Sequence, residues 1–297
     1  MKKSYHNALL IVLLVFVFSS CQNNDKAKYE NSKNIEVGIE LDSLNNAIYQ
    51  TPSPTEILGE ILNQDINIKK ELVNPYKNAS NYITIRNQAV NMGVYIADFA
   101  YLNLSSDKTL ELEYLKVVQD LSEKINIYGI FEQKTLNRIN NNLQFKDSLN
   151  LISQEIYYNI SNNLEKSDRQ NIFVLISSGA IIESLYLSVN LVENFEDYKD
   201  IIQKMYEQKY VFDNFYEYAY NFSEDPYIEQ ILDNLDVLKD TFDKLEVEES
   251  EQQVIKKDDN SLVFKGGYNF ILSKEGFEVF KKNITTIRNE VTTIKKG

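Results

Sequence analysis

The chain has 297 residues, of which 43% are hydrophobic and 25% are charged, so it can bury a normal core as one large domain or two small ones. Its formal net charge is −13, and a surface of that sign repels the phosphates of nucleic acids. The chain contains one histidine, His6, and one cysteine, Cys21, both near the N-terminus. The folded part therefore cannot hold a Ser-His-Asp or Cys-His catalytic site, a His/Cys zinc site or a disulfide.

The first residues have the pattern of an export signal. A pair of lysines precedes the apolar run Ala8–Phe18, which ends at Ser19-Ser20-Cys21. The run has 11 residues, which as a helix rise about 16 Å, roughly half the hydrocarbon thickness of a bilayer, so a cleaved signal is favoured over a spanning anchor. Phe18-Ser19-Ser20-Cys21 resembles the lipobox of bacterial lipoproteins. We therefore predict a signal peptide over residues 1–20 and lipidation of Cys21.

The mature chain is predicted to consist of a tether and one helical domain. Residues 21–50 are rich in Asn, Lys, Glu and Ser, which is typical of a polar tether. Residues 51–297 are predicted to form a single α-helical domain. Its first helix is expected over 54–72, because Ser53-Pro54-Thr55-Glu56 combines a capping Ser, a Pro at the first helical position and a Glu three residues after the cap. Asn74-Pro75 ends that helix.

Apolar residues at three- and four-residue spacing predict a series of further helices. They span 79–104, 107–126, 132–142, 146–164, 168–193, 196–221 and 226–246. The clearest start signals are Ser106, Ser167 and Asp225-Pro226.

The C-terminal part is predicted to leave the helical pattern briefly. Gln253–Lys256 and Leu262–Lys265 are expected to pair as a small β-hairpin, and the charged interval 247–260 is expected to be a disordered loop. Ser273 is expected to cap a last helix that reaches about residue 295. The predicted fold class is all-α, a bundle of about nine helices with a small hairpin near the C-terminus.

Two of the predicted helices are apolar on nearly all sides. Residues 89–104 carry a single charge, Asp98, and residues 172–192 carry a single charge, Glu183. Such helices are surrounded by protein or lipid. The second is long enough to span a bilayer, but six polar residues interrupt it. We therefore predict that both are central helices of a soluble bundle.

The two central helices also resemble one another. Gly93–Phe99 aligns with Gly179–Leu185 at an offset of 86, and the pattern that starts at Tyr114 aligns with the pattern at Tyr198 at an offset of 84. This similarity predicts an internal duplication with two pseudo-equivalent halves. The halves cover 79–126 and 168–213. Chance similarity between apolar helices is the alternative.

Gly93 and Gly179 lie inside these helices. Each costs up to about 1 kcal/mol relative to Ala, so a compensating gain is expected. We predict that the two helices cross closely at the glycines; a ligand that approaches the backbone is the alternative.

Three segments resemble a family. Ser53–Glu56, Asn74–Tyr76 and above all Gln88–Tyr101 are similar to uncharacterised all-helical envelope lipoproteins of Bacteroidetes-type bacteria. The resemblance covers most of the mature chain and implies an envelope location, with the outer membrane as the expected membrane. It implies no activity.

The candidate site residues are the two lone acids and the tyrosines beside them. A carboxylate on an apolar helix must be paired, hydrogen-bonded or neutralised by a raised pKa. Asp98 and Glu183 are expected to bond a Tyr hydroxyl or one of the mature chain's four arginines, and removing either carboxylate is expected to destabilise the fold. If they instead line a binding site, Tyr95 and Tyr186 join them. The arginines are Arg86, Arg138, Arg169 and Arg288.

These patterns favour a binding protein over an enzyme. No Gly-rich phosphate loop, EF-hand loop or paired metal motif is present in the sequence, and no catalytic residue, metal ligand or cofactor is predicted. The predicted function is an interaction or accessory module of the cell envelope, which meets the membrane through its lipid and binds an envelope protein or a glycan. The alternative is a ligand-binding lipoprotein with a polar interior site near Asp98 and Glu183.

Overall fold

The computed structural model describes residues 51–61, 67–105, 107–256 and 262–293. All of them belong to one compact unit, Leu41–Gly297. The predicted signal peptide, the lipidation site Cys21, the tether over 21–50 and the start signal Ser106 lie outside the described residues.

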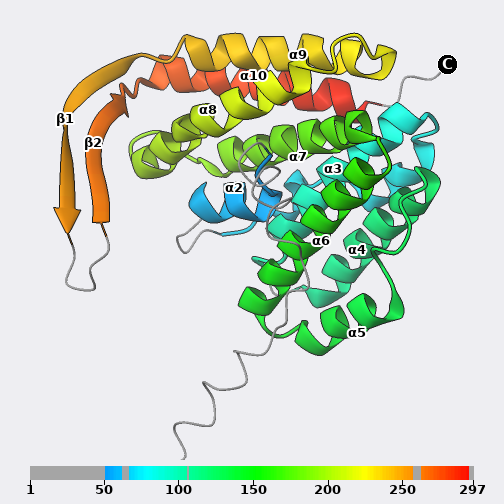
Figure 1. The fold of residues 1–297 in the computed structure, drawn as a ribbon. Coiled ribbons are helices and arrows are strands. Elements are labelled where there is room, and N and C mark those ends of the chain that lie inside the picture. Colours follow the sequence, from blue (N-terminus) through cyan, green and yellow to red (C-terminus); the bar gives the residue numbers. More distant parts are fainter. Residues whose placement is uncertain (1–50, 62–66, 106, 257–261, 294–297) are drawn as a thin grey trace, which may run out of the picture. The chain divides into compact units, whose positions relative to one another are not determined.

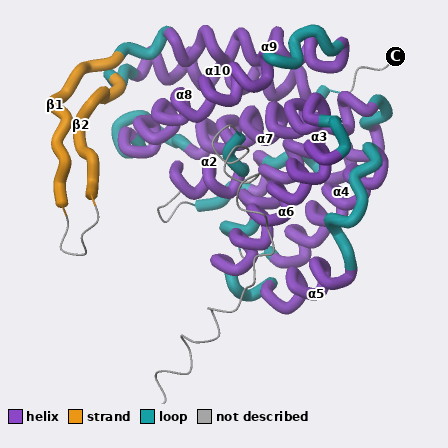
Figure 2. Tube along the Cα trace, in the orientation of Figure 1, coloured by secondary structure: helices purple, strands orange, loops and turns teal. Residues whose placement is uncertain are grey.

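Helices form most of the described chain, and one antiparallel hairpin supplies its strands (Figures 1 and 2). The α-helices of this part are α2 (Pro54–Ile61), α3 (Ile85–Leu102), α4 (Lys108–Lys124), α5 (Gln133–Asn142), α6 (Lys146–Lys166), α7 (Gln170–Leu191), α8 (Lys199–Tyr220), α9 (Pro226–Asp243) and α10 (Lys274–Thr292). Short 3₁₀ helices span Lys70–Leu72 and Tyr76–Asn81, and strands β1 (Val247–Lys256) and β2 (Leu262–Phe270) precede α10. The predicted all-α bundle with a hairpin near the C-terminus is therefore confirmed.

Several helices begin where the sequence supplies a capping side chain. At α2, the Ser53 N–H donates to Glu56 Oε2 (2.7 Å) and the Glu56 N–H donates to Ser53 Oγ (3.3 Å), which is the reciprocal pair of a capping box. Asp225 and Ser273 accept first-turn N–H groups of α9 and α10 at 2.7 and 3.1 Å. Ser167 does not start α7 as predicted: it follows the last residue of α6.

Helices α3 and α7 form the centre of the fold. α7 packs against α2, α3, α6, α8, α9 and α10. It is the described helix that is long and apolar enough to cross a membrane, yet 94% of its most apolar window is buried inside the protein. α7 is therefore surrounded by protein, as a central helix of a bundle is.

The buried serines of α7 are satisfied without breaking the apolar packing. Ser178, Ser184 and Ser188 each donate to the carbonyl oxygen four residues earlier at 2.7 Å. Ser177 Oγ accepts from Tyr157 OH at 2.9 Å. Because these hydroxyls bond within the helix or to one neighbour, α7 can be buried on all sides despite its polar residues.

α3 and α7 cross at their glycines with the two backbones in contact. A Cβ added to Gly93 would lie 1.8 Å from the Ile176 carbonyl oxygen, and one added to Gly179 would lie 1.9 Å from the Val90 carbonyl oxygen. The contacts are reciprocal, because each glycine faces the carbonyl group of the residue three positions before the other glycine. The duplication itself stays a prediction.

The first predicted helix, 54–72, is shorter than expected. α2 ends at Ile61. Further along, the Lys69 N–H donates to Tyr101 OH of α3 at 2.9 Å, so it does not continue a helical ladder. The tertiary contact with α3 thus replaces the local structure that apolar spacing favours.

The hairpin is longer than predicted. Val247 pairs with Phe270 and Lys256 pairs with Leu262, with an irregular register between Ser250 and Gln253. The part of the expected disordered loop that is described, residues 247–256, is therefore a strand. Backbone bonds to β2 outweigh the low strand propensity of its glutamates.

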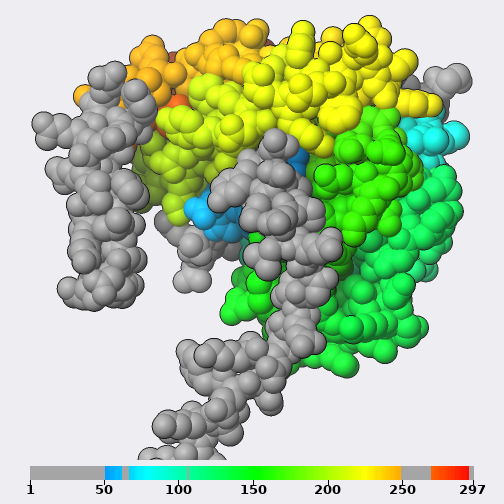
Figure 3. Space-filling view, viewed as in Figure 1, coloured from blue at the N-terminus to red at the C-terminus, as the bar shows by residue number. Residues whose placement is uncertain are grey.

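The elements after α7 cover one side of it. α8 and α9 pack on α7 and on each other, and α10 packs against α9, α7 and α3. In the space-filling view, the side chains of α8 and α9 (lime to yellow) form a continuous surface (Figure 3). α10 thereby joins the core helices α3 and α7 to α9.

Candidate functional site

The two predicted acids meet in the core, where an arginine joins them. Asp98 of α3 and Glu183 of α7 are fully buried. Arg288 of α10 donates from Nε to Glu183 Oε2 at 2.9 Å and from Nη2 to Glu183 Oε1 at 3.1 Å. The expectation that an arginine pairs with a lone acid is met at Glu183, and the bidentate geometry makes the pair a strong one. Asp98, Glu183 and Arg288 are called the buried charge cluster below.

Arg288 is enclosed on its other sides. Its Cζ lies 4.4 Å from the ring centre of Tyr186, and its Nη2 donates to the Leu72 carbonyl at 3.5 Å. Burial lowers the pKa of Arg288, but the Glu183 carboxylate outweighs burial and raises this pKa above its ordinary value. Burial raises the pKa of Glu183, and Arg288 opposes that rise. Arg288 is thus a cation, and Glu183 is the carboxylate that balances it.

Asp98 is only partly hydrogen-bonded within the buried charge cluster. Its Oδ2 accepts the Asn74 N–H at 3.1 Å, whereas its Oδ1 is buried without a donor among the described residues. Burial raises the pKa of Asp98 well above its ordinary value, and the adjacent Glu183 carboxylate raises it further. Arg288 opposes this rise, and the net direction favours the protonated form of Asp98 over its carboxylate.

Tyr95 bonds the backbone and not an acid. Its hydroxyl donates to the Pro75 carbonyl at 3.0 Å, and Tyr114 OH donates to the Asn74 carbonyl at 2.9 Å. Burial raises the pKa of Tyr95 above its ordinary value, so this phenol is a neutral donor. Together these bonds hold Asn74-Pro75 against α3 and α4, where the Asn74 N–H reaches Asp98.

The four predicted binding residues thus lie in one region, and Glu183, Asp98 and Tyr95 bond other groups of the protein. Glu183 is taken by Arg288, Asp98 by Asn74 and Glu183, and Tyr95 by Pro75. The buried charge cluster is therefore a structural joint that links α3, α7 and α10.

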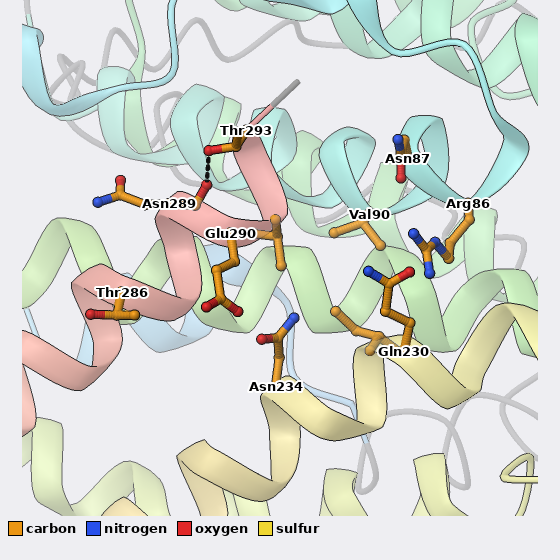
Figure 4. Close-up of a pocket in the computed structure, with 11 residues that line it drawn as sticks. Arg86, Asn87, Val90, Gln230, Asn234, Thr286, Asn289, Glu290 and Thr293 are labelled. Carbon is orange, nitrogen blue, oxygen red and sulfur yellow. Dashed lines mark hydrogen bonds between the residues drawn. The ribbon is translucent and has the colours of Figure 1, made fainter. Parts of the chain in front are cut away.

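A second site lies at the surface and was not predicted from the sequence. A groove of about 570 Å³ opens between the start of α3, the middle of α9 and the end of α10 (Figure 4). This volume lies within the range of small-molecule sites. Its lining is mostly polar: Arg86, Asn87, Val90, Gln230, Ile231, Asn234, Thr286, Asn289, Glu290, Val291 and Thr293.

The walls of the groove are fixed by contacts to the core. Asn91 Nδ2 donates to the Val291 carbonyl at 3.0 Å, and Tyr82 OH donates to the Thr292 carbonyl at 3.1 Å. Arg288 binds Glu183 directly before the lining residue Asn289. The last turn of α10 is therefore held against α3 and α7, and the groove between it and α9 is preformed.

Arg86 is the described arginine that lacks a polar contact. Arg138 forms a bidentate pair with Glu155 at 2.9 Å, and Arg169 donates to the Ile125 carbonyl at 2.6 Å. No hydrogen bond or ion pair joins the Arg86 guanidinium to any described residue, although the residue is half-buried in the groove lining. Its guanidinium is available to a ligand.

Glu290 provides the opposite charge in the same lining. In Figure 4, Glu290 points from α10 toward Asn234 of α9, and Arg86 points toward Gln230. No ion pair joins Glu290 to Arg86 within the described residues. The groove thus presents one cationic and one anionic group separately.

Sequence reasoning missed this groove. The signal within single helices was weak: polar or small side chains recur at helical spacing, as in Gln230 and Asn234 or in Thr286, Asn289 and Thr293. Such spacing is typical of any solvated helix face. Only the packing of three helices places these faces around one hollow.

In the part of the chain that the structure describes, no group of three or more His, Cys, Asp or Glu residues could hold a metal ion. Comparison of the chain with family models, curated proteins and solved structures gives no match.

Proposed function

We propose that this chain is an exported, lipid-anchored binding module of the bacterial cell envelope, with the groove between α3, α9 and α10 as its binding site. The observation that carries the proposal is the unpaired Arg86 in a preformed, polar groove. Partial burial takes hydrogen bonds with water away from the Arg86 guanidinium, and a ligand with an anionic or polar acceptor can replace them. The module therefore acts by recognition.

Binding is favoured over catalysis by the chemistry of the lining. The lining contributes a single carboxylate, Glu290, whereas hydrolysis by two carboxylates needs a second acid at a defined separation. Its remaining polar groups are carboxamides, threonine hydroxyls and one guanidinium. Such groups hold a ligand by hydrogen bonds and charge.

The alternative, a polar interior site near Asp98 and Glu183, has less support. Both acids are fully buried, and their polar contacts are made by Arg288, Asn74 and each other. A ligand there would have to displace a bidentate buried ion pair, which costs more than filling an open groove.

The anchor part of the proposal rests on the sequence and has its own prediction. Cys21→Ser should abolish lipidation, because the thiol is the acceptor, and should move the protein out of the membrane fraction. Incorporation of radiolabelled fatty acid into the parent and the variant measures it. Ser19→Ala, which keeps a small residue in the processing site, should still be labelled; equal labelling of Cys21→Ser would contradict the anchor.

The groove part is tested by blocking the groove. Asn234→Trp places a large ring in the lining, whereas Asp233→Trp places the same ring on the exposed side of α9. Thermal unfolding of the full-length protein in detergent is measured with panels of amino acids, tripeptides, monosaccharides, dicarboxylates and inorganic phosphate.

We expect at least one panel to raise the midpoint of the parent and of Asp233→Trp, because a ligand that binds the folded state stabilises it. The same panel should leave Asn234→Trp unchanged. If no panel shifts the parent, or if both tryptophan variants respond alike, the groove is not the binding site.

A further inference from the structure

We infer that the groove binds a short peptide with free termini, whose carboxylate pairs with Arg86 and whose ammonium group pairs with Glu290. The inference rests on the proposed function and names its ligand. It follows from three properties of the lining: two opposite charges that are not paired with each other, carboxamides from α3 and α9, and buried aliphatic residues.

The charge pair selects a zwitterion. A guanidinium presents a planar fork of donors that matches a carboxylate or a phosphate. Phosphate is disfavoured, because Glu290 shares the lining and the chain as a whole carries a net charge of −13. A ligand with one carboxylate and one ammonium group instead satisfies Arg86 and Glu290 together.

The carboxamides select a backbone of peptide groups between these ends. They come from α3 and α9: Asn87 from α3, and Gln230 and Asn234 from α9. The Asn289 amide of α10 points away from the α9 residues in Figure 4. Each carboxamide offers a donor and an acceptor, and a peptide group offers the same two functions. Several carboxamides around one hollow can therefore bond successive peptide groups.

The floor favours a peptide over a sugar. Val90 and Ile231 are buried beneath the polar rim, and Val291 lies beside them in the lining. These aliphatic groups suit a small apolar side chain of the ligand. The lining residues include no aromatic ring on which a sugar could stack.

The test measures thermal unfolding of the full-length protein in detergent with equimolar tripeptide mixtures. One mixture has free termini, a second is N-acetylated and a third is C-amidated. We expect the free mixture to raise the midpoint of the parent by about 2 °C or more, and each capped mixture to raise it less. Capping tests each charge without altering the protein.

Variants assign each end of the peptide to its partner. Arg86→Gln removes the partner of the peptide carboxylate, so the free and amidated mixtures should raise its unfolding midpoint equally. Glu290→Gln removes the partner of the ammonium group, so the free and acetylated mixtures should raise its midpoint equally. Lys282→Gln and Glu275→Gln, exposed residues of α10 outside the lining, should respond as the parent does. A merely structural role of Arg86 would lower the response to all mixtures equally.

Three outcomes would overturn the inference. In the first, free and capped mixtures raise the midpoint of the parent equally. In the second, no tripeptide mixture raises it. In the third, the difference between free and capped mixtures remains in both Arg86→Gln and Glu290→Gln. The proposed function can hold even if the peptide inference fails. It holds if another compound panel raises the unfolding midpoint of the parent and of Asp233→Trp but not that of Asn234→Trp.

Discussion

Gly179→Ala is expected to destabilise the protein strongly, although alanine is the better helix former. The added Cβ would lie 1.9 Å from the carbonyl oxygen of Val90, which is backbone of α3 and cannot move aside as a side chain can. Overpacking of this kind costs about 1–3 kcal/mol or more, against a gain in helix propensity of up to about 1 kcal/mol. The midpoint of thermal unfolding should fall by several degrees.

Gly59→Ala is the matched control for this prediction. Gly59 also lies in a helix, α2, but an added Cβ meets nothing within 4 Å, so alanine there should stabilise by up to about 1 kcal/mol. Gly93→Ala should resemble Gly179→Ala, and the double variant should lose less than the sum, because a first separation of the helices relieves the second clash. Unchanged melting of Gly179→Ala would contradict the backbone contact.

Glu183→Gln is expected to have the second large effect. The amide cannot balance Arg288, which is left as a buried charge without its carboxylate. Removing one partner of a buried ion pair costs about 3–5 kcal/mol. Equilibrium denaturation of the full-length protein in detergent should therefore show a much lower free energy of unfolding, or no cooperative transition.

Asp98→Asn is the control, and it separates two acids that the sequence treats alike. Asparagine can donate to Glu183 and accept the Asn74 N–H, as a protonated Asp98 does, so the structure predicts a small effect where the sequence alone predicts destabilisation. A loss at Asp98→Asn as large as that at Glu183→Gln would mean that Asp98 is ionised.

The pH dependence has a definite sign. The folded pKa of Asp98 is raised above its ordinary value of 3.8, so its stabilising contribution is complete below that value and is lost as pH rises through the raised pKa. Asparagine cannot ionise. The stability of Asp98→Asn relative to the parent should therefore increase as pH rises above 3.8, the ordinary pKa of Asp98, which urea denaturation at a series of pH values measures.

Local patterns determined most of the secondary structure. The capping box at Ser53 and the caps at Asp225 and Ser273 act within one turn of chain, so the sequence alone places those helix starts. The absence of a polar face on α3 and α7 likewise requires burial on all sides. A glycine in the middle of each implies a close neighbour, and the backbone contact between α3 and α7 supplies it.

Elsewhere, tertiary contacts overrode the local preference. Near the end expected for the first helix, the Lys69 N–H bonds Tyr101 OH, a group far away in sequence, and not a carbonyl of its own segment. The strand over Val247–Lys256 depends on its ladder with β2 and not on its own glutamate-rich composition. No periodicity within either segment carries this information.

The sites show the same division. The sequence alone determined that Asp98 and Glu183 need partners, because an apolar helix face cannot solvate a carboxylate. Only the tertiary structure decided that Arg288 pairs with Glu183, that burial beside Glu183 raises the pKa of Asp98 and that Arg86 faces a groove without a partner. The physical reason is that charge pairing and hollows arise between helices, and the packing of α3, α7, α9 and α10 sets which side chains meet.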